Sequence, residues 1–224
     1  MNKPTIIFDM DGTLLDLAYD DFIWNTLLPI RYAEIHQCTL EESKKVLFTF
    51  YQEHNHTLNW YSSKFWTSKV GIDVLNMQLE YKHKVSLRKG CLELLKFLKN
   101  NNYNIWLATN ADKAGLSFKL QEMNLASYFD VIVSSEEIGH AKEFIEFWQI
   151  LQQKHPFDPK NCYFIDDTEK VLNGAKKFGI EHLISIQQPS SDTAPRLTFS
   201  YPMLETLTDL ISYLKHTEEP KKYA

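Results

Sequence analysis

The sequence predicts an α/β protein with a doubly wound, mostly parallel sheet and a helical cap domain inserted after the first strand. Short, continuous apolar runs alternate with helix-like patterns through most of the 224 residues. Continuous apolar runs are typical of strands buried on both faces of a parallel sheet. Residues 16–85 contain no such run, although they are rich in aromatic side chains. We therefore expect an α/β core formed by residues 1–15 and 86–224 and a helical cap formed by residues 16–85.

Five apolar runs are the predicted strands, and several of them end in acidic or hydroxyl side chains. In chain order they cover residues 4–9, 104–109, 130–134, 161–166 and 182–186. Helical patterns fill the gaps between them. Strands that alternate with helices form parallel sheets with right-handed crossovers, so this arrangement favours a doubly wound sheet.

Apolar side chains at helical spacing predict the helices of the core. The stripes are Leu116, Leu120 and Met123; Phe144, Phe147, Trp148 and Leu151; and Val171, Ala175 and Phe178. A last amphipathic helix is expected to carry Leu204, Leu207, Ile211 and Leu214. Residues 215–224 are expected to form a solvated tail.

Composition narrows the classes of function. Hydrophobic residues make up 44% of the chain and charged residues 24%, which excludes a disordered or fibrous protein. The net charge of −5 and the lack of a basic stripe argue against polymeric nucleic acid as a ligand. A small phosphorylated molecule remains compatible with this charge.

The cysteines and the hydropathy of the chain indicate the cellular compartment of the protein. The cysteines Cys38, Cys91 and Cys162 fit neither a disulfide framework nor a paired zinc pattern. No apolar segment approaches the roughly 20 residues that cross a bilayer, and the first residues do not resemble a signal peptide. We therefore expect a cytoplasmic protein that binds no membrane. Its oligomeric state stays open.

Acidic and hydroxyl side chains gather at the predicted strand ends. Ligands of an open α/β sheet bind outside the carboxyl ends of the strands, where the strand order reverses. If the first strand lies between the second and the fourth, one crevice receives a set of polar groups from all three. These groups are Asp9, Asp11, Thr109, Asn110, Asp166 and Asp167.

Such a cluster of carboxylates needs a cation or bound protons. Two carboxylates about 4 Å apart repel each other by roughly 4 kcal/mol at an effective dielectric constant near 20. Oxygen ligands suit hard divalent cations, and Mg²⁺ is commonly held by a few carboxylates with water and phosphate oxygens. The sequence therefore predicts a magnesium site at this edge of the sheet.

These residues also carry a resemblance to a known family. Residues 9–13 (Asp-Met-Asp-Gly-Thr), 109–110 (Thr-Asn), Lys142 and 166–167 (Asp-Asp) resemble, in that order, the four motifs of the haloacid dehalogenase-like (HAD) phosphohydrolases. The resemblance covers the whole core, and it implies a Rossmann-like fold with a helical cap. Two cap stretches, residues 14–24 and 56–61, are similar to the bacterial GMP/IMP 5′-nucleotidase subgroup.

The resemblance implies a role for each motif residue. Asp9 would be the nucleophile that forms an aspartyl-phosphate, and Asp11 would be the general acid and base. Thr109, with the backbone amides that follow it at Asn110, would bind phosphoryl oxygens. Lys142 would open the helix that follows it and balance the charges of the phosphate and Asp9.

The metal ligands follow from the same resemblance. Asp9, the backbone carbonyl of Asp11 and Asp167 would ligate Mg²⁺, whereas Asp166 would act through a water molecule or orient the other ligands. The family often has Lys-Pro at the third motif, and this chain has Lys142-Glu143. This departure concerns only how the following helix begins.

Aromatic and histidine side chains in the cap allow two interpretations. Trp60 and Tyr61 are candidate substrate contacts because of the subgroup resemblance, and base stacking on an aromatic ring contributes about 1–3 kcal/mol. Together with Trp24 and Trp66 they also suit the core of a small helical bundle. The cap histidines His54, His56 and His83 match no zinc spacing, so we expect them to be exposed or hydrogen-bonded.

The favoured function is a Mg²⁺-dependent phosphomonoester hydrolase acting on a purine nucleoside 5′-monophosphate such as GMP or IMP. A phosphatase or phosphomutase of sugar phosphates or other small phosphometabolites shares the same motifs. A dehalogenase is disfavoured because it needs neither Asp11 nor the acidic pair Asp166 and Asp167. A non-catalytic module that binds phosphorylated ligands is the alternative from a different class.

Overall fold

Six parallel strands form the centre of the molecule in the computed structural model, which describes residues 3–218. The strands are β1 (Thr5–Phe8), β2 (Asn104–Thr109), β3 (Val131–Ser134), β4 (Cys162–Ile165), β5 (His182–Ile186) and β6 (Met203–Leu204). Their order in the sheet is β3-β2-β1-β4-β5-β6, and each neighbouring pair is parallel. The doubly wound α/β fold is confirmed, and β1 lies between β2 and β4, which is the condition on which the predicted crevice depends.

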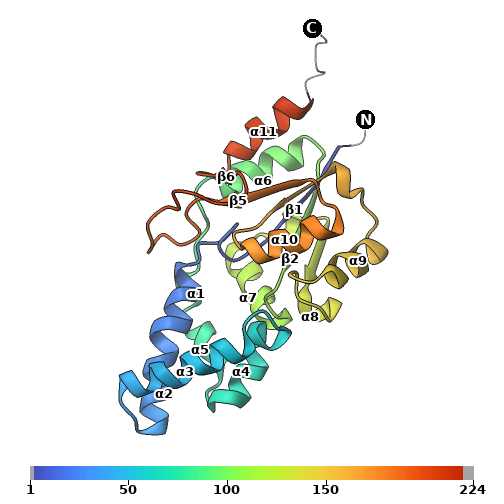
Figure 1. Ribbon diagram of the computed structural model, residues 1–224. Helices are drawn as coiled ribbons and strands as arrows, with labels where there is room; N and C mark the ends of the chain where they lie inside the picture. The colour runs from blue at the N-terminus through green and yellow to red at the C-terminus, as the bar shows by residue number, and fades with distance from the viewer. Residues whose placement is uncertain (1–2, 219–224) are drawn as a thin grey trace.

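Helices cover both faces of this sheet (Figure 1). They are α6 (Cys91–Asn100), α7 (Lys113–Met123), α8 (Ser135–Ile138), α9 (Ile145–Lys154), α10 (Glu169–Phe178) and α11 (Asp209–Glu218). One apolar cluster joins one face of the sheet to α6, α7 and α11, and a second joins the other face to α8, α9 and α10.

Strand β1 shows why its apolar run is continuous. Ile6 and Phe8 pack in the first apolar cluster, whereas Ile7 packs in the second. All three side chains are fully buried. Alternating side chains therefore face two hydrophobic layers, and truncating such a residue to alanine typically costs about 2–5 kcal/mol.

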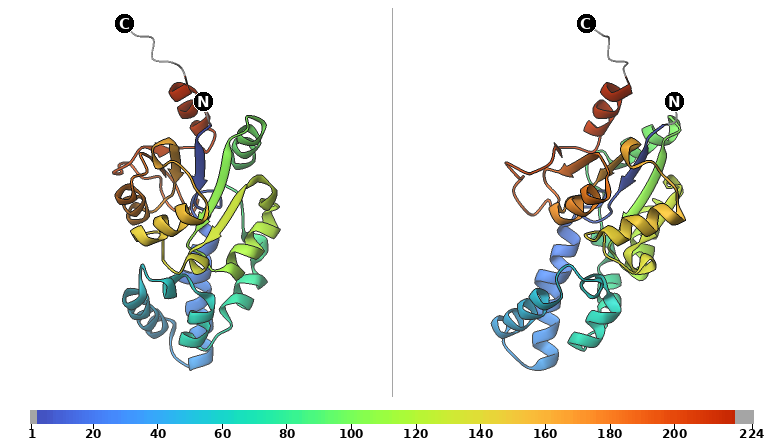
Figure 2. Two further views of the ribbon diagram at one scale, coloured as in Figure 1. Left: turned by 90° about the vertical axis from the view of Figure 1, so that its right-hand side faces the viewer. Right: turned by 45° about the vertical axis from the view of Figure 1, so that its right-hand side comes forward.

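A group of helices is inserted between β1 and α6, and we call residues 18–84 the inserted helices. They comprise α1 (Ala18–Phe22), η1 (Ile23–Leu27), α2 (Leu28–His36), α3 (Leu40–His54), η2 (Leu58–Tyr61), α4 (Ser63–Val70), α5 (Val74–Glu80) and η3 (Lys82–Lys84). Both views of Figure 2 place them beyond the end of the sheet where β1 stops. Their apolar side chains continue the first apolar cluster.

The chain leaves and re-enters the core at one place. Leu15 forms an antiparallel bridge with Leu87, and the amide of Asp16 donates to the carbonyl of Ser86 at 2.9 Å. The two connections between β1, the inserted helices and α6 therefore run side by side. No helix within residues 3–218 is long and apolar enough to span a membrane.

The C-terminal elements correct one prediction. Leu204 lies in β6, where it pairs with Ile186, and α11 begins only at Asp209. Both side chains are buried, that of Leu204 in β6 and that of Leu207 in the turn before α11, so their helical spacing is a coincidence. The predicted tail is helical as far as Glu218, and residues 219–224 lie outside the described part.

The start of α9 corrects a second prediction. The helix begins at Ile145, so Lys142 lies in the turn before it rather than in its first turn. Phe144, which the helical stripe placed inside the core, is 48% exposed at the N-cap position. Phe147 and Trp148 are fully buried as the stripe predicted.

Candidate active site

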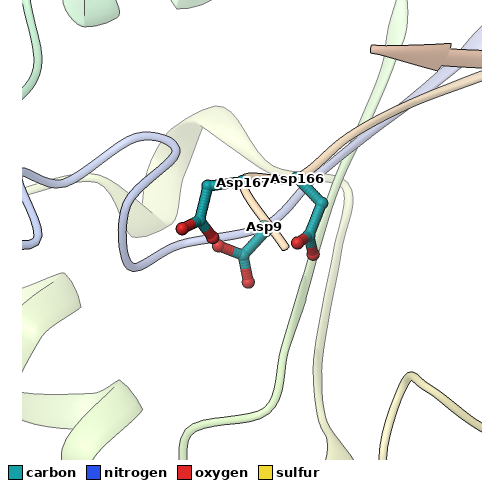
Figure 3. A group of neighbouring side chains, drawn as sticks. All are labelled: Asp9, Asp166 and Asp167. Carbon is teal, nitrogen blue, oxygen red and sulfur yellow. The ribbon is translucent and has the colours of Figure 1, made fainter. Parts of the chain in front are cut away.

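Three carboxylates converge where β1 and β4 end. Asp9 follows β1, and its amide donates to the carbonyl of Ile165 at 2.9 Å; Asp166 and Asp167 follow β4. One carboxylate oxygen of each aspartate lies within 4.8 Å of one from the other two, and all three residues are buried. Figure 3 shows the three carboxylates facing a common space. The convergence that the strand order predicted is therefore present.

Lys142 lies between two of these carboxylates. Its Nζ donates to Asp9 Oδ1 at 2.5 Å and to Asp166 Oδ2 at 2.7 Å, and its side chain is 1% exposed. Burial alone would lower the pKa of Lys142, but Asp166 and Asp9 more than offset this effect, so the pKa is raised. The lysine is therefore a permanent positive charge beside Asp9.

The backbone around Lys142 is fixed by three neighbours. Its amide donates to Asn110 Oδ1 at 2.9 Å, and its carbonyl accepts from Trp148 Nε1 at 2.8 Å. Helix α10 approaches closely through Gly174, where an added Cβ would lie 2.7 Å from the Lys142 carbonyl oxygen. A glycine at this point lets α10 pack directly against the turn that presents the lysine.

Burial favours the protonated forms of the acidic cluster when no metal ion is bound. Burial raises the pKa of Asp9 to about 7, with Asp166 adding to the effect and Lys142 opposing it. Burial and the charge of Asp9 likewise raise the pKa of Asp167 to about 7. Asp9 Oδ2 is buried with no hydrogen-bond partner among the described residues. An acceptor of this kind costs about 1–3 kcal/mol when it stays unpaired, and a hard divalent cation would satisfy it.

The two aspartates after β4 differ in how their oxygens are engaged. Asp166 donates nothing and accepts twice, from Lys142 Nζ through Oδ2 and from the Thr168 amide through Oδ1 at 2.8 Å. Asp167 sits over Gly12, whose φ is +85° and whose added Cβ would lie 2.8 Å from the carboxylate. Arg196 donates from Nη1 to the Asp167 carbonyl oxygen at 2.7 Å. The Asp167 carboxylate makes only longer contacts, since Oδ1 accepts from the Thr168 hydroxyl at 3.2 Å and Oδ2 lies 3.9 Å from Arg196 Nη2. Its oxygens are therefore held less tightly than those of Asp166.

A second buried lysine, which the sequence analysis did not single out, holds Asp11. Lys119 Nζ donates to Asp11 Oδ1 at 2.7 Å and to both oxygens of Asp20 at 2.8 and 2.9 Å. Its side chain is 3% exposed, and the two carboxylates raise its pKa although burial opposes them. Lys119 stands on α7 beside Leu116 and Leu120, and a lysine within that predicted apolar stripe was the available signal.

Thr109 and Asn110 end β2 beside the acidic cluster. The hydroxyl of Thr109 accepts from the Ala111 amide at 3.0 Å and retains its own proton for donation. Asn110 uses both ends of its side chain, because Oδ1 accepts from the Lys142 amide and Nδ2 donates to Glu143 Oε2 at 3.0 Å. What Asn110 can offer a phosphate is therefore its backbone amide.

A cavity of about 370 Å³ connects the sheet edge to the inserted helices. Asp9, Thr109 and Lys142 line it from the core, and Trp60 and Tyr61 line it from the inserted helices. Its size falls in the range of about 300–1,000 Å³ that is typical of small-molecule sites. The predicted substrate candidates therefore face the same space as the predicted catalytic residues.

The aromatic residues of the inserted helices serve both as core and as cavity wall. Trp66 is 1% exposed and packs edge-on against Trp24, Tyr51 and Trp60. Trp60 is only half-buried, and its carbonyl accepts from Trp66 Nε1 at 2.8 Å. Trp66 is therefore a core residue that also borders the cavity, whereas the half-buried Trp60, whose side chain is more exposed, lines the same cavity.

The remaining sequence candidates behave as polar contacts. Tyr61 Oη donates to Glu143 Oε1 at 2.6 Å, and His56 Nδ1 lies 3.2 Å from the same oxygen. His54 packs edge-on against the ring of Phe65. Among the side chains that the structure describes, those of residues 3–215, the one group of acidic, histidine or cysteine residues with metal-ligand spacing is Asp9, Asp166 and Asp167.

The carboxylates lie at the ends of adjacent parallel strands, with a buried lysine between them. The inserted helices border the cavity in front of them. This arrangement is that of an α/β enzyme whose active site is built on aspartates. The chain belongs to the haloacid dehalogenase-like hydrolase family, whose model matches residues 6–184. The resemblance found in the four motifs is thereby confirmed.

Individual relatives agree with this assignment. The chain is 31% identical over 210 residues to the GMP/IMP nucleotidase YrfG of Escherichia coli strain K12, covering 94% of this chain and 95% of that protein. It is 23% identical over 126 residues to the phosphorylated carbohydrates phosphatase of Thermotoga maritima, covering 56% and 58%. The crystal structure of a HAD phosphatase from Thermococcus onnurineus superposes with a TM-score of 0.78 at 18% identity, covering 96% and 98%.

Proposed function

We propose that this HAD-like phosphatase hydrolyses small phosphomonoesters with Mg²⁺ and an aspartyl-phosphate on Asp9. The observation that carries the proposal is the state of the Asp9 carboxylate. Lys142 holds its Oδ1, while its Oδ2 is buried without a hydrogen-bond partner among the described residues. The carboxylate is therefore oriented through Oδ1, and no described residue donates a hydrogen bond to Oδ2 that would compete with a metal ion or a phosphoryl group.

The acidic cluster fits Mg²⁺ in chemistry and in charge. Asp9, Asp167 and the backbone carbonyl of Asp11 would hold the ion directly, and Asp166 would act indirectly because Lys142 and Thr168 already engage its oxygens. When bound, Mg²⁺ supplies positive charge that offsets the carboxylates and polarises a phosphoryl group. The Thr109 hydroxyl, the Asn110 amide and the Lys142 ammonium would bind the phosphoryl oxygens.

Each step of the reaction can be assigned to residues of the chain. The Asp9 carboxylate attacks phosphorus, the ester P–O bond breaks, and Asp11 gives its proton to the leaving alkoxide. A water molecule then gives a proton to Asp11 and attacks phosphorus, which releases inorganic phosphate and restores Asp9. Lys142 stays charged throughout and balances the negative charge that builds up at the phosphoryl group.

For the substrate we propose a purine nucleoside 5′-monophosphate such as GMP or IMP. The half-buried Trp60 lines the cavity together with the carboxylates, and a base stacked on an aromatic ring gains about 1–3 kcal/mol. The nucleotidase from E. coli, which is named for GMP and IMP, matches almost the whole chain. Residues 16–85 would act as the cap that closes the cavity and excludes water.

The partner in this proposal is the small phosphorylated metabolite alone, and we propose a cytoplasmic location. Three free cysteines, Cys38, Cys91 and Cys162, are in keeping with a reducing compartment.

Sugar phosphates remain the second substrate class, because the relative from Thermotoga maritima is named for phosphorylated carbohydrates.

A phosphate-release screen tests the proposal. The purified chain is assayed with purine and pyrimidine 5′-monophosphates, hexose phosphates and p-nitrophenyl phosphate, with Mg²⁺ or with EDTA. We expect turnover to be fastest with GMP or IMP and to stop in EDTA. Turnover without metal would contradict the Mg²⁺ assignment, a preference for hexose phosphates would contradict the nucleotide assignment, and binding without turnover would identify a non-catalytic module. Transfer of phosphate between positions of a sugar, followed by mass spectrometry, would identify a mutase.

A further inference from the structure

One buried carboxylate, that of Glu143, joins the inserted helices to the sheet edge. Its Oε1 accepts from Tyr61 Oη at 2.6 Å and lies 3.2 Å from His56 Nδ1, which donates when it carries the proton. Its Oε2 accepts from Asn110 Nδ2 at 3.0 Å. The side chain of Glu143 is 6% exposed. Hydrogen bonds to a charged acceptor are roughly twice as strong as neutral ones, so this carboxylate strongly orients its partners.

The contacts of Glu143 lead directly to the catalytic lysine. Asn110, which Glu143 holds through Nδ2, accepts from the Lys142 amide through Oδ1 at 2.9 Å. Lys142 in turn donates from Nζ to Asp9 Oδ1. A continuous series of hydrogen bonds therefore runs from Tyr61 through Glu143, Asn110 and Lys142 to Asp9.

The backbone near Glu143 leaves little room for adjustment. An added Cβ on Gly174 would lie 2.6 Å from the Glu143 carbonyl oxygen, so α10 packs directly against this turn. On the opposite side, His56 has a positive φ of 63°, a left-handed conformation that is uncommon for residues other than glycine. Gly174 leaves the Glu143 backbone little room to move, and removing the carboxylate takes from the Asn110 side-chain amide and the Tyr61 hydroxyl the group that both contact.

We propose that Glu143 is a positioning residue through which His56 and Tyr61 of the inserted helices fix Asn110 and Lys142 for phosphoryl transfer. The inference rests on the proposed function only in taking Lys142 as part of the phosphoryl-transfer site. In this proposal the Tyr61 hydroxyl holds Glu143, and Tyr61 also lines the cavity. It also gives the Lys142-Glu143 step a role in catalysis beyond the start of a helix.

The test compares Glu143→Ala with the matched control Glu146→Ala. Glu146 lies three residues further along, is exposed, and stands in the first turn of α9. Values of kcat and KM are measured with p-nitrophenyl phosphate and with GMP in saturating Mg²⁺. We expect Glu143→Ala to lower kcat about 10- to 100-fold for both substrates, since small misplacement of a catalytic group costs this much. KM for p-nitrophenyl phosphate should change less than about twofold, and Glu146→Ala should match the wild type.

Two milder variants separate positioning from a purely structural role. Glu143→Gln keeps one acceptor oxygen and should recover part of the lost kcat. Tyr61→Phe should lower kcat by a smaller factor, and the Tyr61→Phe/Glu143→Ala double variant should be no slower than Glu143→Ala alone, because both changes act through one contact. Independent, multiplying losses would overturn the inference, as would a Glu143→Gln or Tyr61→Phe variant with wild-type kcat. These two variants also carry the test if Glu143→Ala does not fold, as judged by thermal unfolding.

An NMR measurement, which needs no turnover, tells whether this inference or the proposed function has failed. In the NMR spectrum of the full chain, the Lys142 backbone amide and the Asn110 side-chain amide should shift in Tyr61→Phe and remain in place in Glu146→Ala. Unchanged Lys142 and Asn110 signals in Tyr61→Phe would overturn the inference whatever the enzyme hydrolyses. Shifted signals in a chain that releases phosphate from no ester would instead overturn the proposed function.

Discussion

The two sides of the cavity each contain a buried lysine that bridges two carboxylates, but they are built differently. On the sheet edge, Lys142 joins Asp9 and Asp166, which follow adjacent strands of one rigid sheet. On the opposite side, Lys119 joins Asp11, which follows β1, to Asp20 in α1 of the inserted helices. The first arrangement is built from core residues, and the inserted helices reach it indirectly, through Glu143. The second arrangement includes Asp20 of α1 itself.

This difference between the two lysine sites predicts different effects of mutation on kcat, on stability and on substrate binding. The sheet edge contains the proposed nucleophile and the proposed metal ligands, so changes there should act on kcat. Lys119 of α7 and Asp20 of α1 hold Asp11 from the other side, and Trp60 belongs to the aromatic wall of the inserted helices, so changes at Lys119 or Trp60 should act on stability or on substrate binding. The predictions below test this division from the largest expected effect to the smallest.

Replacing the nucleophile should have the largest effect. Asp9→Asn keeps the shape of the side chain and leaves Lys142 paired with Asp166, so the fold should persist. We expect phosphate release to fall at least about 10⁴-fold, as for nucleophiles in other covalent mechanisms. The measurement is phosphate release together with a thermal unfolding curve. A variant that retains appreciable turnover would show that another group attacks phosphorus.

The two lysines should respond differently to Mg²⁺. Lys142→Met should lower kcat about 10²- to 10³-fold, because it removes a cation from the phosphoryl site. Breaking either buried ion pair should also cost about 3–5 kcal/mol of unfolding free energy. Mg²⁺ should restore part of that loss in Lys142→Met, since it lies among the same carboxylates, and should restore none in Lys119→Met. Urea denaturation with and without Mg²⁺ checks this, and equal recovery in both variants would remove the distinction between the two sites.

The aromatic wall should act on substrate binding. Trp60→Ala should raise KM for GMP about tenfold, since the stacking of one base contributes about 1–3 kcal/mol. KM for p-nitrophenyl phosphate should change by less than about twofold, and kcat should be nearly unchanged for both. Steady-state kinetics with the two substrates is the measurement. A similar change in both KM values would exclude Trp60 from base recognition.

Metal removal should make stability depend on pH. In the metal-free protein, burial raises the pKa of Asp9 and Asp167 from 3.8 to about 7, so the folded state binds more protons than the unfolded chain between these values. The free energy of unfolding should therefore fall as pH rises from about 4 to about 7, and the stabilisation by Mg²⁺ should grow over the same window. Thermal unfolding in EDTA and in Mg²⁺ measures both. A gain from Mg²⁺ that stays constant with pH would contradict the raised pKa values.

The sheet and the acidic cluster were predictable because they depend on short-range signals. A continuous apolar run marks a buried parallel strand, and its last residue marks the rim of the sheet. Asp9, Asp166 and Asp167 could therefore be placed at one rim, and their convergence depended on the condition that the first strand lies beside the fourth. The role of Lys142 required the family resemblance. The two-residue strand β6 was missed because Leu204 and Leu207 happen to have helical spacing.

The contacts between the core and the inserted helices were not predictable in the same way. Whether Lys119 meets Asp20, or Glu143 meets Tyr61, depends on how helices far apart in sequence pack against each other. A local pattern contains no information on that packing, and a lysine in the stripe of α7 or a glutamate before α9 reads as solvated. The polar groups that link the two sides therefore emerged only from the structure.

Trapping the covalent intermediate tests the central claim most directly. The enzyme is mixed with substrate and Mg²⁺, quenched during turnover and treated with borohydride, which reduces an aspartyl-phosphate to homoserine. Peptide mass spectrometry should then find homoserine at position 9, and the Asp9→Asn variant should show none. Phosphate release without modification at Asp9, or with modification at another aspartate, would contradict the account.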